Sequence, residues 1–309
     1  MMTDKKPSTQ PLVSVIVNCY NGEKFLKEAL DSIYAQTYSN WEIIFWDNGS
    51  TDNSAMIVKS YDSRLKYFKS LDTLPLYAAR NMALQKCSGE FVTFLDCDDL
   101  WLKNKLALQV KTMLEHDYAL IYSSFYVVDS AKKIKRKYSV KNSSGNVFSH
   151  IAKHYNIAIL TVMLRRSFLD KHALHFDDDS KYFGDFTLFC LIASMSSVGV
   201  IPDFLCLYRE HDGALSSKMN LIDHKMEHNI MKAYLHARIS ESNYKLLAQK
   251  IDYFYDASLI KLNLLNGDAK LAKLTAKKYL MTDLKLSVCY FMLYLPALLR
   301  CRLLKNYMR

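Results

Sequence analysis

Short apolar runs alternate with amphipathic segments over the first 130 residues of the chain. Four of these runs have the length and the β-branched or aromatic content of strands that are buried on both faces. They are residues 13–17, 41–47, 65–69 and 90–96. The segments between them repeat apolar residues at helical spacing, as Phe25, Ala29 and Ile33 do. Strand–helix units in this order predict the α/β class, with a mostly parallel sheet flanked by helices.

The pattern becomes less regular beyond residue 130. Residues 118–129 predict a strand that leads into a basic turn, Lys132–Lys137, and residues 184–195 predict a helix. From residue 221 onward the apolar spacing is helical to the end. We therefore predict two parts, a sheet domain at 1–220 and a helical basic C-terminal region at 221–309.

Positive charge is concentrated in that C-terminal region. The chain has 309 residues and a net charge of +10, and residues 221–309 carry 15 basic and 7 acidic side chains. Residues 1–220 are nearly balanced, with 26 basic and 24 acidic side chains. Half of all residues are apolar and 23% are charged, which excludes a wholly disordered or fibrous chain. A nearly neutral body with a basic tail indicates contact with an anionic surface.

The last 26 residues combine apolar side chains with a cationic fringe. The longest uncharged stretch, Leu286–Leu299, lies between Lys285 and Arg300 and is too short to cross a bilayer. A helix packed on the body would explain its apolar residues, whereas an interfacial helix on an anionic leaflet also explains the cations. We therefore expect the C-terminal region to associate with the membrane, with the cytoplasmic membrane surface as its partner.

Other features bear on location and partners. The chain starts without the apolar segment of a signal peptide, and its seven cysteines show no CxxC or metal-type spacing. We therefore expect a cytoplasmic protein that is peripheral on the inner face of the cell membrane. The basic run Lys132–Lys137 fits either a solvated hairpin turn or contact with lipid headgroups. No nucleic-acid motif accompanies it, so we expect no nucleic-acid partner.

Polar residues gather where the predicted strands end. The first strand leads into Asn18–Asn21, the second into Asp47–Ser50 and the fourth into Asp96–Asp99. In an open parallel sheet, ligands bind at this edge. Three carboxylates within Asp96–Asp99 repel one another unless a cation or a donor-rich ligand lies among them. Oxygen ligands of this kind suit Mg²⁺ or Mn²⁺, and no glycine-rich phosphate loop is present.

Three stretches at these positions resemble the family 2 glycosyltransferases of the GT-A fold. They are PLVSVIVNCYNGEKFLKEALDSIYAQTYSNWEIIFWDNGSTDNS, AARNMAL and GEFVTFLDCDDLW. The resemblance implies a Rossmann-like, mostly parallel sheet and an inverting, metal-dependent enzyme. Such an enzyme moves a sugar from a nucleotide diphosphate-sugar, here a UDP-sugar by preference, to a hydroxyl of a glycan or lipid-linked acceptor. It would act in bacterial surface polysaccharide synthesis, such as that of lipopolysaccharide, capsule or O-antigen.

The resemblance also implies a role for each matched residue. Those expected at the donor nucleotide sugar are Asn18, Tyr20, Asn21, Asp47, Asn48, Arg80, Asp96 and Arg209. Asp98 and His211 are expected to hold the metal, and Asp185 in GDFTLFCLIA is expected to be the general base. The chain departs from the family pattern at Asn18, at Asn48, where a carboxylate is usual, and at Gly184, where a glutamate is usual.

Rival interpretations remain open from the sequence. A non-catalytic nucleotide-sugar-binding scaffold would retain the fold, and a sugar nucleotidyltransferase would share the open sheet and paired acids. The second would carry a glycine-rich basic loop after the first strand, where this chain has NCYNGEKF.

Two residue assignments also have alternatives. Asp185 also fits an exposed acid at a helix N-terminus. His224 to His228 fits an HxxEH zinc spacing, although a solvated helix face explains it better.

Overall fold

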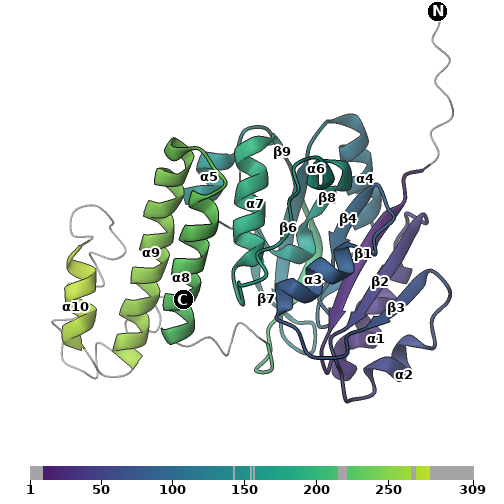
Figure 1. The fold of residues 1–309 in the computed structure, drawn as a ribbon. Coiled ribbons are helices and arrows are strands. Elements are labelled where there is room, and N and C mark those ends of the chain that lie inside the picture. The colour runs from purple at the N-terminus through teal and green to yellow at the C-terminus, as the bar shows by residue number, and fades with distance from the viewer. Residues whose placement is uncertain are drawn as a thin grey trace, which may run out of the picture. The chain divides into compact units, whose positions relative to one another are not determined.

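The computed structural model divides the chain into two compact units, Met1–Ser217 and Lys218–Arg309. It describes residues 10–141, 143–153, 155, 157–214, 221–265 and 269–278. The interfacial helix expected at 284–309 lies outside these residues. Figure 1 shows the elements of both units.

The first unit is built on one mixed sheet. Its strands are β1 (Val13–Cys19), β2 (Trp41–Asp47), β3 (Leu65–Lys69), β4 (Phe91–Phe94), β5 (Leu100–Trp101), β6 (Leu120–Val128), β7 (Ile134–Tyr138), β8 (Met163–Arg165) and β9 (Val198–Arg209). Its helices are α1 (Glu23–Tyr34), α2 (Ser54–Val58), α3 (Leu76–Leu84), α4 (Lys105–Glu115), α5 (Phe148–Lys153), α6 (Arg166–Lys171) and α7 (Gly184–Met195), with a 3₁₀ turn at Ile159–Thr161.

The strand order in the sheet is β3-β2-β1-β4-β8-β6-β9-β5, and β7 pairs with β6. The pairs β1–β2, β1–β4 and β2–β3 are parallel, as the alternating pattern predicts. The second half of the sheet is mixed, because β8 runs antiparallel to both of its neighbours, while β6 and β9 are parallel. The fold class is therefore α/β of the expected kind, with a parallel half and a mixed half.

Burial on both faces explains why β1 and β2 are mostly apolar. Two of their buried polar residues, Ser14 and Glu42, pair with each other, with Ser14 Oγ donating to Glu42 Oε1 at 2.6 Å. Every residue of both strands is buried, and successive side chains point to opposite faces of the sheet. Val15 and Val17 join the core beneath α1, whose buried stripe includes Leu26, Leu30 and Ile33. The opposite face of the same strands is in contact with α3. Helices on both faces leave the strand ends as the exposed edges of this half of the sheet (Figure 1).

The basic run expected to be a turn is mostly a strand. Ile134–Tyr138 forms β7, which is exposed along its length and pairs antiparallel with β6. The turn itself comes earlier, where Asp129 Oδ1 accepts hydrogen bonds from the backbone N–H groups of Ala131 and Lys133. Lysines and an arginine on an exposed edge strand discourage pairing with another sheet, which explains their concentration there.

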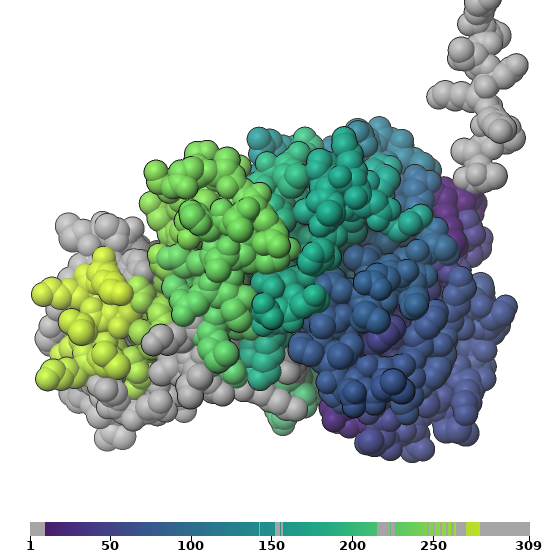
Figure 2. All heavy atoms as spheres, viewed as in Figure 1, coloured from purple at the N-terminus to yellow at the C-terminus, as the bar shows by residue number. Residues whose placement is uncertain are grey.

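The second unit is helical as far as it is described, in green to yellow in Figures 1 and 2. It contains α8 (Leu221–His236), α9 (Glu241–Leu265) and α10 (Ala269–Lys277), with α9 in contact with both of the others. His228 Nε2 lies 2.6 Å from Asp252 Oδ1. In the described part of the chain no three His, Cys, Asp or Glu side chains are grouped to hold a metal, so the zinc interpretation has no support there. None of the described helices is long and apolar enough to span a membrane.

Candidate active site at the carboxyl ends of the strands

The three polar loops predicted from the sequence meet at one edge of the sheet. The chain passes from β1 to β2 and β3 on one side, and then returns to place β4 on the other side of β1. The strand order therefore reverses between β1 and β4, which is where open α/β sheets bind ligands (Figure 1). Asn18 and Asp47 lie at the ends of β1 and β2, and Asp96 follows β4, so all three lie at this edge.

The first loop is anchored to the second. Asn21 has a φ of 53°, which an asparagine tolerates better than most residues, and its Oδ1 accepts a hydrogen bond from the Thr51 backbone N–H at 2.9 Å. The Asn21 N–H donates to Ser50 Oγ at 3.0 Å. Tyr20, which directly precedes Asn21, is 55% exposed and is available to stack on a ligand. Asn21 thus acts on loop geometry here, while Tyr20 lies open at the edge.

Asp47 and Asn48, expected near the donor base, both hold neighbouring loops. Asp47 accepts hydrogen bonds from the Ser50 N–H at 2.7 Å and from the Tyr67 hydroxyl at 2.6 Å. Asn48 forms two bonds with the backbone of Leu74, donating through Nδ2 at 2.8 Å and accepting through Oδ1 at 3.0 Å. One amide N–H and one oxygen lone pair of Asn48 remain for a base.

Asn18 has a buried side chain that is suited to bind a polar ligand. Its side chain is 8% exposed, and neither its amide nitrogen nor its oxygen has a hydrogen-bond partner. Trp46 is paired with Asn18 in the register of β1 and β2, and its indole N–H is also buried without a hydrogen-bond partner. Buried polar groups are nearly always paired in folded proteins. A ligand with both donors and acceptors, such as a nucleobase, would satisfy Asn18 when bound.

The three carboxylates after β4 have separate partners. Asp96 Oδ1 lies 2.6 Å from Nη2 of Arg80, a buried arginine of α3. Asp98 Oδ2 lies 2.9 Å from His211 Nε2, and Asp99 accepts the backbone N–H of Arg209 at 2.8 Å. Burial and the negative charge of Asp96 raise the pKa of Asp98, against the opposing effect of His211. Asp98 is thus a partly exposed carboxylate whose charge the protein only partly offsets.

The pair of Asp98 and His211 fits a divalent cation. A carboxylate oxygen and an imidazole nitrogen are both ligands that Mn²⁺ accepts, and Asp98 is 28% exposed to an incoming ion. A bound cation would offset the charge that raises the pKa of Asp98. These two side chains would hold it, with further oxygens supplied by a ligand.

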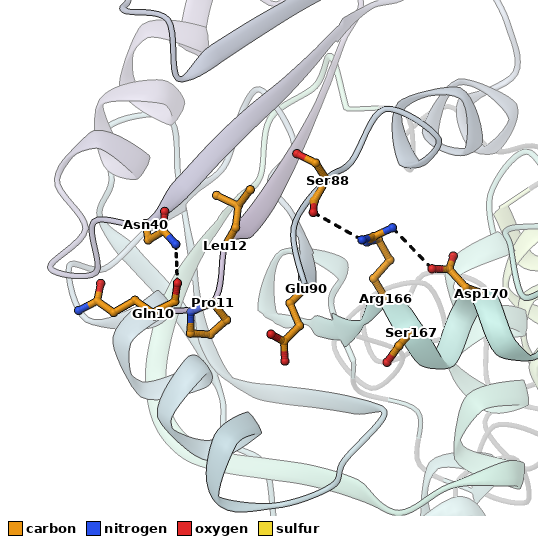
Figure 3. A pocket seen from close by; sticks show the side chains of 9 residues that line it. All are labelled: Gln10, Pro11, Leu12, Asn40, Ser88, Glu90, Arg166, Ser167 and Asp170. Atoms are coloured by element: carbon orange, nitrogen blue, oxygen red, sulfur yellow. Dashed lines mark hydrogen bonds and ion pairs between the residues drawn. The ribbon is translucent and has the colours of Figure 1, made fainter. Parts of the chain in front are cut away.

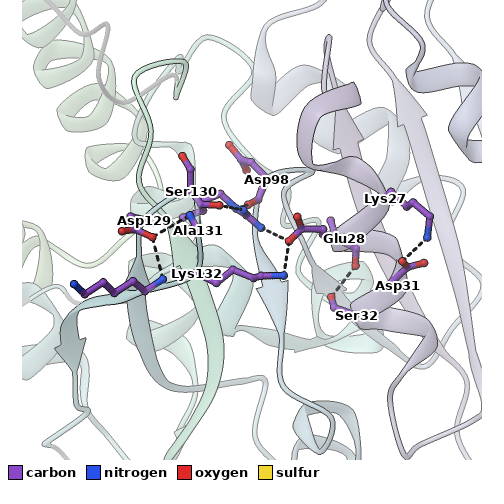
Figure 4. Close-up of polar contacts among 12 residues, drawn as sticks. Lys27, Glu28, Asp31, Ser32, Asp98, Asp129, Ser130, Ala131 and Lys132 are labelled. Atoms are coloured by element: carbon purple, nitrogen blue, oxygen red, sulfur yellow. Dashed lines mark hydrogen bonds and ion pairs between the residues drawn. The ribbon is translucent and has the colours of Figure 1, made fainter.

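Arg209, expected at the diphosphate, faces inward. Its side chain has no exposed surface, and its guanidinium donates to the carbonyls of Asp98 and Ser130 at 2.8 and 2.9 Å. Its Nη2 lies 3.0 Å from Glu28 Oε2. Lys132 Nζ lies 3.1 Å from the same oxygen, as Figure 4 shows. In this structure Arg209 therefore positions the Asp98 loop, and a direct contact with a diphosphate would require it to leave these partners.

Asp185 lies in the first turn of α7, partly buried. Its Oδ1 accepts a hydrogen bond from the Tyr77 hydroxyl at 2.9 Å. Burial raises the pKa of Asp185, while Arg80 and the Tyr77 hydrogen bond oppose the rise. A partly buried carboxylate with a raised pKa is typical of a proton acceptor in catalysis.

Sequence reasoning missed three residues that organise this site. Tyr77 and Asn81 of α3 contact Asp185 and the loop after α6, where Asn81 Nδ2 donates to Asp178 Oδ1 at 2.7 Å. Glu28 of α1 supports Arg209. The local sequence gives no sign of these roles, except that Asn81 follows Arg80 in AARN and Tyr77 directly precedes this segment.

A cavity of about 450 Å³ lies away from this site (Figure 3). Its lining comes from the segments that precede β1 and β4 and from the start of α6. These segments lie at the amino ends of the parallel strands, opposite to the acidic loops. The cavity therefore has no part in the chemistry of Asp96–Asp99.

Solved structures share this fold. Staphylococcus aureus TarS, solved as residues 1–349 in complex with UDP-GlcNAc, matches 96% of this chain and 89% of its own with a TM-score of 0.67 and 20% identity. The mannosyltransferase PcManGT from Pyrobaculum calidifontis, in complex with GDP-Man and Mn²⁺, matches 98% and 88% with a TM-score of 0.59 and 17% identity. The sheet and its flanking helices therefore define a protein of the GT-A glycosyltransferase fold.

Sequence comparison narrows this class to a family. The family model described as "Glycosyl transferase family 2" matches residues 14–172, and the chain belongs to this family. It is 30% identical over 209 residues to the Escherichia coli UDP-Glc:alpha-D-GlcNAc-diphosphoundecaprenol beta-1,3-glucosyltransferase WfgD, covering 67% of this chain and 80% of WfgD. It is 31% identical over 160 residues to TuaG of Bacillus subtilis, a putative teichuronic acid biosynthesis glycosyltransferase, covering 51% and 63%. A Rickettsia conorii relative is 32% identical, but the matched region is only 33% of its length.

The protein is therefore a glycosyltransferase, as the resemblance in the sequence predicted. Membership of this family also removes the sugar nucleotidyltransferase from consideration.

Proposed function

We propose that this glycosyltransferase inverts the configuration of a sugar that it moves from a nucleotide diphosphate donor to a hydroxyl acceptor. The observation that carries the proposal is the placement of two contacts along α3. Arg80 contacts Asp96, while Tyr77, one turn earlier, contacts Asp185. A donor-side acid and a candidate base therefore lie beside one helix, which supports a donor and an acceptor bound next to each other there.

Asp185 is the proposed general base. It takes the proton from the acceptor hydroxyl as that oxygen attacks C1 of the donor sugar. One base is sufficient for an inverting displacement, because the leaving group is a diphosphate that needs no proton. Partial burial and a raised pKa suit Asp185 to this task at neutral pH.

The donor is proposed to bind across the ends of β1, β2 and β4. The unpaired amide of Asn18 and the exposed ring of Tyr20 would contact the nucleoside, and Asp96 the ribose. Asp98 and His211 would hold Mg²⁺ or Mn²⁺. This cation supplies Lewis-acid stabilisation of charge on the diphosphate when bound. A UDP-sugar is the favoured donor, since TarS binds UDP-GlcNAc and WfgD uses UDP-Glc.

The acceptor is proposed to be a glycan or a lipid-linked glycan of a bacterial surface polysaccharide. WfgD acts on an acceptor carried by diphosphoundecaprenol, and TuaG is assigned to teichuronic acid synthesis. Such an acceptor lies at a membrane, and the basic C-terminal region would hold the enzyme at the inner face of that membrane.

Two variants test the division of roles. Asp98→Ala removes a proposed metal ligand, so Mn²⁺-dependent donor binding should weaken and transfer should be lost with it. Asp185→Asn keeps the shape of the side chain but cannot take a proton. Donor binding should stay close to wild type while turnover falls by about 10²–10⁴-fold, the usual size of a general-base contribution. Calorimetric titration with UDP-sugar and Mn²⁺, beside a transfer assay, measures both.

The outcomes separate the proposal from its rivals. Near wild-type turnover in Asp185→Asn would show that another residue is the base, with Asp177, Asp178 and Asp179 on the preceding loop next to test. Donor binding by the wild-type protein without transfer to any acceptor and without donor hydrolysis would instead support a nucleotide-sugar-binding scaffold.

A further inference from the structure

Tyr77 is a buried tyrosine whose hydroxyl group lies against the proposed base. The residue is in the first turn of α3, and its hydroxyl lies 2.9 Å from Asp185 Oδ1 and 3.1 Å from the Tyr182 carbonyl oxygen. Its ring packs against Phe176, with ring centroids 5.4 Å apart. The hydroxyl thus has a defined position, fixed by packing around the whole ring.

Gly184 provides the space that the ring of Tyr77 occupies. A Cβ atom at residue 184 would lie 2.6 Å from Cγ of the Tyr77 ring and 2.7 and 2.8 Å from its two Cδ atoms. These distances are shorter than carbon atoms tolerate, so any side chain at 184 would displace the ring or the start of α7. The absence of a side chain at residue 184 and the presence of a large ring at residue 77 are therefore complementary.

The surroundings of Asp185 show what the hydroxyl does electrostatically. The titratable and charged groups that face Asp185 are Tyr77 and Arg80 from α3, Asp96 after β4, Tyr155, and Cys190 of α7. Burial and Asp96 favour the neutral acid, whereas Arg80 and the Tyr77 hydrogen bond favour the carboxylate and so lower its pKa. Because Arg80 is already paired with Asp96, Tyr77 is the hydrogen-bond donor from α3 that contacts Asp185 directly.

We propose that Tyr77 is a positioning residue, which orients Asp185 by donating a hydrogen bond to Oδ1 and leaves Oδ2 to face the acceptor hydroxyl. Gly184 is its structural partner, because it provides the space for the ring. The proposal rests on the proposed role of Asp185 as general base. It adds a group that sets both the direction of the basic oxygen and the pH range in which it is ionised.

The test is the pH dependence of turnover in Tyr77→Phe. This variant keeps the ring that packs against Gly184 and removes only the hydroxyl. Since the lost hydrogen bond stabilised the carboxylate, the pKa of Asp185 should rise, and the acidic limb of the kcat profile should move to higher pH. Turnover at neutral pH should fall by about tenfold, as expected for a hydrogen bond to a charged group. The donor dissociation constant should not change.

A matched control is Tyr61→Phe, which removes a hydroxyl 2.8 Å from Asp31 Oδ1, a carboxylate of α1 outside the site. It should leave the kcat profile unchanged. A second variant, Gly184→Ala, should reduce kcat with little change in donor binding. This loss should be smaller in the Tyr77→Ala background, where no ring opposes the added Cβ atom. Equal losses in both backgrounds would contradict the proposed complementarity of the ring and the glycine.

Asp185→Asn distinguishes failure of this proposal from failure of the proposed function. If Asp185→Asn is inactive while Tyr77→Phe has an unshifted acidic limb and wild-type turnover, Tyr77 does not position the base. If Asp185→Asn remains active, the assignment of the base is wrong, and the role of Tyr77 is overturned with it. A melting temperature of Tyr77→Phe close to that of wild type verifies that the variant is folded.

Discussion

Lys105, the first residue of α4, is a charged side chain with no exposed surface. Its Nζ lies 2.6 Å from Thr93 Oγ1 and 2.6 Å from Gln109 Oε1, and 4.0 Å from the centroid of the Trp101 ring. These partners are neutral, and no ion pair of Lys105 is found within the described chain. Burial therefore lowers the pKa of Lys105 to about 7.

We predict that Lys105 makes the free energy of unfolding depend on pH between about 7 and 10.5. In this window the unfolded state binds more protons than the folded state, so stability rises with pH by at most about 1.4 kcal/mol per unit. Below pH 7 both states are protonated and the burial cost is fully present. Lys105→Met should remove this dependence, and its stability relative to wild type should be greatest at pH 6.

Urea denaturation at pH 6 and pH 9 measures the effect. Lys103→Met, at an exposed position two residues earlier, is the control and should follow wild type at both values. The same pH dependence in Lys105→Met and wild type would show that Lys105 is not the titrating group.

At the scale of elements, the site depends on a contact between α1, the end of β9 and the loop after β4. Arg209 joins them, and Glu28 of α1 is its charged partner (Figure 4). Burial alone would raise the pKa of Glu28, but hydrogen bonds from Arg209 and Lys132 hold this pKa below its usual value. The Asp98 loop is therefore supported from a helix that contributes no ligand to the site.

We predict that Glu28→Gln weakens Mn²⁺-dependent donor binding by roughly two- to fivefold, about 0.5–1 kcal/mol, because Glu28 is 41% exposed and solvent screens the pair. Asp31→Asn, three residues farther along α1, removes a pair with Lys27 that does not touch the Asp98 loop. Calorimetric titration should show a change in the first variant alone. A similar loss of affinity in both would indicate a general effect on α1.

At the scale of the whole molecule, we propose separate tasks for the nearly neutral sheet domain and the strongly basic C-terminal region. Residues 221–309 have an excess of eight positive charges, while the residues that carry the proposed chemistry lie before residue 212. Attraction to an anionic membrane therefore need not disturb the donor site.

We predict that removal of residues 284–309 releases the protein from anionic vesicles without loss of donor binding. Binding of the full chain should also weaken at high salt, because the attraction is partly electrostatic. Sedimentation with anionic and with neutral phosphatidylcholine vesicles measures the first effect, and calorimetry with donor and Mn²⁺ measures the second. Equal sedimentation of the full and shortened chains with anionic vesicles would contradict an interfacial role for this segment.

The sequence by itself determined the parallel half of the sheet and the edge at which the site lies. A strand that has helices packed on both faces is mostly apolar, so β1 and β2 are visible as apolar runs in which Ser14 and Glu42 are the interior polar residues. The carboxylates of Asp96–Asp99 follow such a run directly, and chain connectivity alone brings them to the carboxyl edge. Burial and turn chemistry are local properties, which explains why local patterns reveal them.

Only the tertiary structure decided which polar groups meet. Asp98 and His211 are 113 residues apart, and Tyr77 and Asp185 are 108 apart. Their contacts depend on β9 and α7, which are placed by a mixed half-sheet that includes the three-residue strand β8. The same placement buries Arg209 against Glu28 and the carbonyls of Asp98 and Ser130. Such pairings depend on strand order and on the direction of each side chain, and these are set by packing over the whole domain and not by any local segment.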